Sequence, residues 1–176
     1  MKLPKVEINK ILYTTDLSEG ARYAFAYAVS LANTYRASIT ILHVLFEDRN
    51  IDSIASFYVG REDWLKIKQR TYDEARDALI GKKRDNVAIR DVLQTFSEKA
   101  QTQDEASSFI TDEIVVKNGI PEDIILEQAD ERNCDIIVMG SHGHGVLTGA
   151  VIGSTARRVL RQSHKPVFVV PLPDDA

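Results

Sequence analysis

The chain has 176 residues, of which 44% are hydrophobic and 27% are charged, and its formal net charge is -4. These values are typical of a globular domain, so they argue against intrinsic disorder and favour a single domain over residues 1–176. The acidic balance argues against a nucleic-acid partner. Because Cys134 is the only cysteine and no apolar run approaches the ~18 residues of a membrane span, we expect a cytoplasmic protein with no disulfide and no membrane partner.

Apolar runs and helical spacings alternate along the chain. In chain order they predict a strand at 11–13, a helix at 21–35, a strand at 37–45, a helix at 64–80, a strand at 113–117, a helix at 121–132, a strand at 135–139, a helix at 154–162 and a strand at 166–170. Ser18 or Asp16 can cap the first helix, and Gly81 can interrupt the second. Asn118 and Gly119 predict a turn. We expect an extended helical insert or linker at about 47–112.

Strands that alternate with helices and are apolar along most of their length predict an open parallel sheet of five strands, flanked by helices in a Rossmann-like three-layer α/β/α fold. In such sheets ligands bind beyond the carboxyl ends of the strands, where the strand order reverses. The segments 14–16 and 140–154 both follow predicted strands. We therefore expect both segments to lie on the binding edge.

The most informative motif is the spacing Gly140-x2-Gly143-x9-Gly153-Ser154 between the fourth strand and the last helix. Glycines allow the backbone to turn sharply and to approach a ligand closely, and the start of a helix offers unpaired N–H donors to an anion. The hydroxyls of Ser154 and Thr155 add further donors. The spacing predicts a phosphate site, although an ordinary glycine-rich loop is the alternative.

Other site chemistries are less well supported. His142 and His144 lack a third nearby ligand, so we predict no metal held by protein side chains, and Mg²⁺ would instead accompany bound phosphates. Ser141 does not lie in a G-x-S-x-G motif, and the chain has no P-loop lysine motif. His43, inside an apolar strand, is predicted to be a hydrogen-bonded core histidine.

The chain resembles the universal stress proteins, specifically their ATP-binding branch. The stretches that carry the resemblance are ILYTTDLSEGA, ITILHV, NGIPEDIILEQA, DIIVMGSHGHG and GSTARRVLRQSHKPVFVV, and the branch motif G-x2-G-x9-G-[ST] is matched in full. Two departures are Thr14, where the family often has proline, and a longer connection between the second and third strands. The resemblance implies the adenine nucleotide alpha hydrolase-like fold with strand order 3-2-1-4-5.

The resemblance also implies a set of nucleotide-binding residues. Asp16 would contact the adenosine moiety, the backbone at Val44 would border the adenine, and Met139 and Gly140 would lie against the nucleoside. The full predicted site is Thr14, Thr15, Asp16, Val44, Met139, Gly140, His142, Gly143, Gly153, Ser154 and Thr155. The expected ligand is ATP, with ADP or AMP as alternatives, and no catalytic residue is assigned.

The resemblance further implies a homodimer that forms through the edge strand at residues 166–170. We expect a regulatory protein of the stress response that binds ATP without rapid turnover. Two alternatives stay open, namely a slow ATPase or a phosphoryl or adenylyl transferase, and an interaction module that carries a structural nucleotide and binds a protein partner through the 47–112 insert.

Overall fold

Within the described residues, five strands form one parallel sheet in the order β3-β2-β1-β4-β5. The computed structural model describes residues 5–47, 52, 55–57, 59–85, 110–142 and 152–171. The strands are β1 (Lys10–Thr15), β2 (Ser38–Phe46), β3 (Ile110–Gly119), β4 (Ile136–Gly140) and β5 (Val167–Val170). The predicted fold class and strand order are confirmed.

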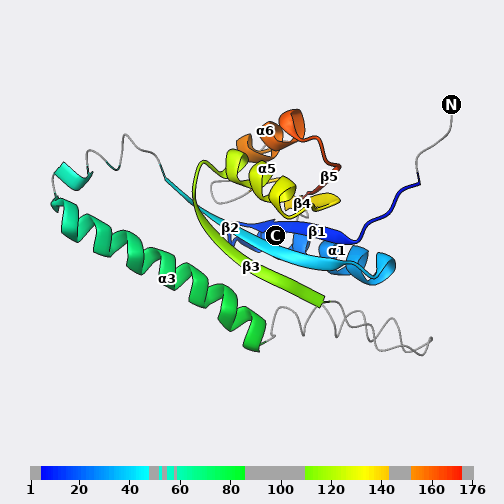
Figure 1. The fold of residues 1–176 in the computed structure, drawn as a ribbon, viewed down its shortest axis with the longest axis horizontal. Helices are drawn as coiled ribbons and strands as arrows, with labels where there is room; N and C mark the ends of the chain where they lie inside the picture. Colours follow the sequence, from blue (N-terminus) through cyan, green and yellow to red (C-terminus); the bar gives the residue numbers. More distant parts are fainter. Residues whose placement is uncertain are drawn as a thin grey trace.

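Helices cover both faces of the sheet (Figure 1). The helices are α1 (Glu19–Tyr35), α3 (Arg61–Asp85), α5 (Pro121–Glu131) and α6 (Ser154–Gln162). Helix α1 packs on one face, while α5 and α6 lie together on the other (Figure 1). In the described part of the chain, none of the helices combines the length and apolar character needed to cross a bilayer.

The two faces of the sheet carry separate hydrophobic cores, and strand β2 contributes to both. Ile39 and Ile41 belong to the core beneath α1, whereas Leu42 and Val44 pack with the core beneath α5 and α6. This alternation follows from the two-residue period of a strand. Because both faces are covered, the strand is apolar on both sides, as its sequence predicts.

Helix α1 begins at Glu19, two residues before the predicted start. Of the two capping candidates, Ser18 is the N-cap, since its side chain accepts a hydrogen bond from the backbone N–H of Ala21. Asp16 instead accepts a hydrogen bond from the N–H of Ser18, at 3.0 Å. Ser18 therefore caps the helix, while Asp16 stabilises the turn that leads from β1 into α1.

Two local predictions were wrong. Asn118 and Gly119 belong to β3, because they pair with Leu45 and Phe46 at the end of β2. Gly81 does not interrupt its helix, since α3 has 25 residues and continues to Asp85. One glycine costs a helix only about 1 kcal/mol relative to alanine, and the neighbouring helical hydrogen bonds can offset that cost.

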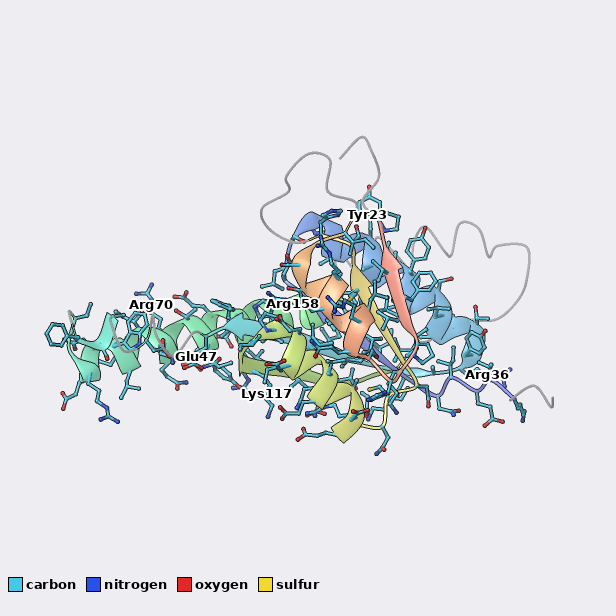
Figure 2. The ribbon with its side chains drawn as sticks, turned by 90° about the horizontal axis from the view of Figure 1, so that it is seen from above. Tyr23, Arg36, Glu47, Arg70, Lys117 and Arg158 are labelled. Carbon is cyan, nitrogen blue, oxygen red and sulfur yellow. The ribbon has the colours of Figure 1, made fainter. Side chains whose placement is uncertain are left out.

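Helix α3 extends from the body of the domain as a long arm beside β3 (Figures 1 and 2). Its contacts with the sheet include a hydrogen bond from the Tyr72 hydroxyl to the carbonyl of Val116, at 3.3 Å, and buried Ala75. Lys68 forms ion pairs with Glu47 and Asp52. Of the 47–112 insert, residues 86–109 lie outside the described residues, and residues 110–112 belong to β3.

Thr40 in β2 provides a test of this packing. Its side chain is fully buried, and its hydroxyl has no hydrogen-bond partner among the described residues. The substitution Thr40→Val replaces that hydroxyl with a methyl group of similar shape, so we expect the free energy of unfolding in urea to rise by about 1 kcal/mol. Thr40→Ala, which leaves a cavity, should lower it. A less stable T40V variant would show that the hydroxyl is hydrogen-bonded.

Candidate functional site

A cavity of about 400 Å³ opens at the carboxyl ends of β1, β2 and β4, on the side of the sheet covered by α5 and α6. Strand β1 connects through α1 to β2 on one side and pairs with β4 on its other side, so the strand order reverses between β1 and β4. Parallel α/β sheets bind ligands at this place. The lining residues are Thr14, Thr15, Asp16, Ala21, Leu42, Val44, Phe46, Pro121, Ile125, Met139, Gly140, Ser141, His142, Gly153, Ser154, Thr155 and Ala156.

Ten of the eleven residues predicted from the sequence line this one cavity. They come from three separate segments: the end of β1, the end of β2, and the region from β4 to α6. Gly143 is the exception, because it lies outside the described residues. Sequence reasoning did not assign Phe46, Pro121 or Ile125, which also line the cavity.

One end of the cavity is apolar because β2 continues past the end of β1. The pairing of β1 with β2 stops at Thr15 and His43, whereas the pairing of β2 with β3 continues to Phe46 and Gly119. Leu42, which still pairs with Thr14 of β1, and Val44 and Phe46 of the overhang lie on the cavity side of β2. On the side where β1 has ended, none of the described strands pairs with the backbone of the overhang. This end can therefore offer a flat apolar surface beside backbone polar groups.

The other end of the cavity is formed by the start of α6. Gly153 is the N-cap residue and supplies no side-chain hydrogen bond. The first intrahelical bond runs from the N–H of Arg157 to the carbonyl of Gly153, at 3.0 Å. The N–H groups of the preceding helical residues, from Ser154 to Ala156, thus have no carbonyl within the helix to bind. Together with the helix dipole they favour an anion at this end.

A hydrogen bond brings the start of α6 against the end of β4. The N–H of Gly153 donates to the carbonyl of Ser141 at 2.8 Å, and the N–H of Ser141 donates to Val170 in β5 at 2.7 Å. A Cβ atom on Gly153 would lie 3.1 Å from the Ser141 carbonyl oxygen, which is a tight contact. The φ of Gly153 is -65°, which any residue can adopt, so this third glycine of the motif is needed for the close approach of the two backbones.

His142 presents one ring nitrogen without a partner. Its Nδ1 lies 2.9 Å from the Ser141 hydroxyl, while its buried Nε2 has no hydrogen-bond partner among the described residues. If the hydroxyl donates to Nδ1, the neutral ring carries its proton on Nε2. Buried polar groups are rarely left unpaired in native proteins. An oxygen acceptor in the cavity would satisfy this N–H.

Thr15 and Asp16 form a tight turn beside the cavity. The Thr15 hydroxyl accepts from the N–H of Leu17 at 3.0 Å, and Leu17 has a φ of 69°. Two side-chain acceptors therefore support this left-handed residue. Beneath the turn, the Tyr13 hydroxyl donates to the carbonyl of Ala21 at 2.6 Å, and burial raises the pKa of Tyr13 above its usual value.

Asp16 is the single carboxylate among the described lining residues, and none of those residues is Lys or Arg. An anion in the cavity would therefore be stabilised by backbone dipoles, hydroxyls and His142 rather than by a cationic side chain. In the described ranges, no group of three His, Cys, Asp or Glu side chains is arranged to hold a metal ion. Buried His43 lies at hydrogen-bond distance from the Thr15 carbonyl, 2.7 Å, as predicted for a core histidine.

A charged pair behind the cavity links its two covering helices. Glu122 in α5 is 6% exposed and pairs with Arg158 in α6. Both residues are close in sequence to lining residues, Pro121 in α5 and Ala156 in α6. The pair fixes α6 relative to α5 and so supports the position of the helix start. The two residues are 36 positions apart in the sequence, so no local pattern predicts their contact.

Comparison with known proteins agrees with this architecture. The model of the universal stress protein family matches residues 7–171. Universal stress protein MJ0577 of Methanocaldococcus jannaschii is 30% identical over 94% of this chain and 96% of that protein. Universal stress protein YxiE of Bacillus subtilis is 30% identical over 92% of this chain and 98% of its own length.

The fold is also similar to solved structures. The structure of MJ0577 has a TM-score of 0.68, with 28% identity and coverage of 96% of this chain and 99% of the other. A universal stress protein from Archaeoglobus fulgidus has a TM-score of 0.52 at 20% identity, over 94% of this chain and 98% of the other, and therefore shares the fold. Because the family model covers nearly the whole sequence, this chain belongs to the universal stress protein family.

Proposed function

We propose that this protein binds an adenine nucleotide, with ATP as the principal ligand, and acts as a regulatory protein of the stress response without rapid turnover. The observation that carries the proposal is the polarity of one cavity, which is apolar at the β2 overhang and rich in hydrogen-bond donors at the start of α6. A nucleotide has the same polarity, with a flat base at one end and phosphates at the other. The volume of about 400 Å³ is suited to a small ligand.

Each part of the nucleotide has a matching group in the cavity. The base lies against the overhang at Val44, and the Asp16 carboxylate accepts hydrogen bonds from the ribose hydroxyls. The phosphates bind the N–H groups and hydroxyls of Ser154 and Thr155, close to Gly153, and His142 Nε2 donates to them. In this proposal Gly143 also binds the phosphates, while Met139 and Gly140 border the nucleoside.

Mg²⁺ would enter with the phosphates. A triphosphate is highly charged, and the described lining residues include no Lys or Arg to neutralise it. Mg²⁺ is usually bound by few protein carboxylates and keeps several waters, so phosphate oxygens and water can supply its ligands. This arrangement needs no metal site built from protein side chains.

Related structures give limited further support. Universal stress proteins of the same fold have been solved in complex with cAMP and with dAMP, each with a TM-score of 0.52 and 20% identity to this chain. At 20% identity these structures show that the fold is shared, but they do not show that the ligand is shared. Our proposal of an adenine nucleotide therefore rests on the cavity itself.

A charge placed at the start of α6 tests the phosphate site. Ser154 is exposed at the first helical position, where an aspartate would interact favourably with the helix dipole. We expect Ser154→Asp to preserve the melting temperature yet to weaken Mg-ATP binding at least about tenfold, which is about 1.4 kcal/mol, in isothermal titration calorimetry. Gln162→Glu adds the same charge at the other end of α6 and is the matched control. Equal affinities in S154D and wild type would place the phosphates elsewhere.

His142 allows the phosphate contact to be separated from the nucleoside contact. Loss of one hydrogen bond to a charged phosphate costs about 1.5–3 kcal/mol, so His142→Ala should weaken ATP binding by about tenfold or more while leaving adenosine binding unchanged. His142→Gln keeps a side-chain N–H donor and should restore part of the affinity. An equal loss for adenosine and ATP in H142A would contradict a phosphate role.

We also propose that the chain forms a homodimer through β5. This strand ends the order of the described strands, so one of its edges pairs with none of them and can pair with a second copy. Beside that edge, Phe168 is 37% exposed and its ring lies 5.6 Å from the ring of Tyr27 in α1. Two such pairs related by a two-fold axis would give the interface an aromatic centre.

Light scattering after size exclusion tests this dimer. Phe168→Glu places a carboxylate on the proposed interface, and we expect it to convert the dimer into a monomer at micromolar concentration. Phe57→Glu makes the same change at a residue that is 83% exposed and far from β5 in sequence, and it should leave the dimer intact. A wild-type monomer, or a dimeric F168E variant, would contradict the proposed interface.

A further inference from the structure

Phe46, the last residue of β2, is exposed at the rim of the cavity. It is 65% exposed, although it continues the row formed by Leu42, which is 0% exposed, and half-buried Val44. All three side chains line the cavity, and burial decreases along the row from the core to the rim. A large aromatic side chain thus forms the outer part of the apolar end without being needed to fill a core.

Contacts of the strand backbone fix the position of Phe46, although most of the residue is exposed. Phe46 pairs with Gly119 of β3, and the N–H of Glu47 donates to the Gly119 carbonyl at 3.1 Å. Glu47 also forms an ion pair with Lys68 of α3. Figure 2 shows Glu47 beside this helix. Backbone bonds and an ion pair therefore fix the position of the strand end. Because Gly119 has no side chain, the neighbouring position on β3 does not cover the ring.

The other side chains at this end are also apolar. Pro121 and Ile125 of α5 line the cavity together with Leu42, Val44 and Phe46. None of these five side chains has a hydrogen-bonding group, so they can recognise a base only by its surface. Aromatic stacking favours the larger ring system of a purine over that of a pyrimidine, because more π-surface is in contact.

We propose that Phe46 is the stacking platform for the nucleobase and that it gives the site its preference for purines. The inference rests on the proposed nucleotide function and assigns to Phe46 a role in specificity. The ring stacks on the base while the base edge faces the backbone of the β2 overhang. Affinity for the base then depends on an aromatic face, whereas affinity for the phosphates depends on the start of α6.

Calorimetry with a matched set of ligands tests this role. The Phe46→Ala variant loses the stacking contact with the base. It should therefore bind Mg-ATP about tenfold more weakly than wild type, which is about 1.4 kcal/mol. CTP binding should fall less, so the ratio of ATP to CTP affinity should decrease. Tripolyphosphate, which has no base, should bind F46A and wild type equally. Phe46→Tyr keeps the ring and should bind ATP like wild type, whereas Phe46→Leu keeps only apolar surface and should resemble F46A.

Phe57→Ala is the matched control, because Phe57 is 83% exposed and does not line the cavity, and it should not alter the affinity. Melting curves of F46A should match wild type, since most of the ring is exposed. If wild type binds ATP and F46A binds it equally well, or if F46L matches F46Y, the stacking role is wrong while the proposed function stands. If wild type binds neither ATP nor tripolyphosphate, the proposed function is wrong and this inference with it.

Discussion

The hydrogen bond from the Gly153 N–H to the Ser141 carbonyl is the contact on which the candidate site depends. At 2.8 Å it joins the start of α6 to the chain leaving β4, and the Ser141 N–H is in turn bound to Val170 of β5. Backbone hydrogen bonds therefore hold helix α6 against the ends of β4 and β5. A side chain at position 153 would meet the Ser141 carbonyl oxygen at 3.1 Å, so the bond is compatible with glycine and disfavours larger residues. The uncapped N–H groups of α6 and the edge of the sheet then face one cavity, and neither forms a site alone.

The described lining of the site offers backbone dipoles and hydroxyls to an anion but no cationic side chain, and this composition bears on how fast the site could transfer a phosphoryl group. Fast phosphoryl transfer uses lysine, arginine and metal ions to stabilise charge that develops in the transition state. Among the described lining residues none is Lys or Arg, and the one carboxylate, Asp16, also accepts a hydrogen bond from the turn into α1. A fixed helix start stabilises the phosphates of the bound ligand and those of a transition state to a similar degree. Such uniform binding raises affinity without raising turnover, as our proposal of binding without rapid turnover requires.

Much of this arrangement could be predicted from the sequence, because strand and helix types follow local periodicity. The apolar runs placed all five strands, and the glycine spacing together with the family resemblance selected ten residues that line the cavity. The errors arose where a distant partner overrides a local signal. Asn118 and Gly119 have turn composition, yet pairing with β2 keeps them in β3. Phe46 and the Glu122 and Arg158 pair were missed for the same reason, since only strand register and helix packing bring them to the site.

Two ion pairs stabilise the elements around the cavity: Glu122 with Arg158 near its donor-rich end, and Lys68 with Glu47 near its apolar end. Glu122 is buried between α5 and α6 and accepts from Arg158, which sets the position of the donor-rich end. Lys68 of α3 pairs with Glu47, which directly follows Phe46 at the apolar end, and also with Asp52 of the insert. The apolar end is therefore connected to the long arm, while the donor-rich end is connected to the body of the domain (Figure 2). The start of α6 is bonded to the chain that leaves β4, and Glu47, which follows Phe46, is paired with α3. A ligand that spans the cavity would therefore lie between an end fixed on the sheet and an end next to the link with the arm. The arm is thus linked to the apolar end of the cavity through Glu47, in addition to its contact with β3 through Tyr72 and Val116.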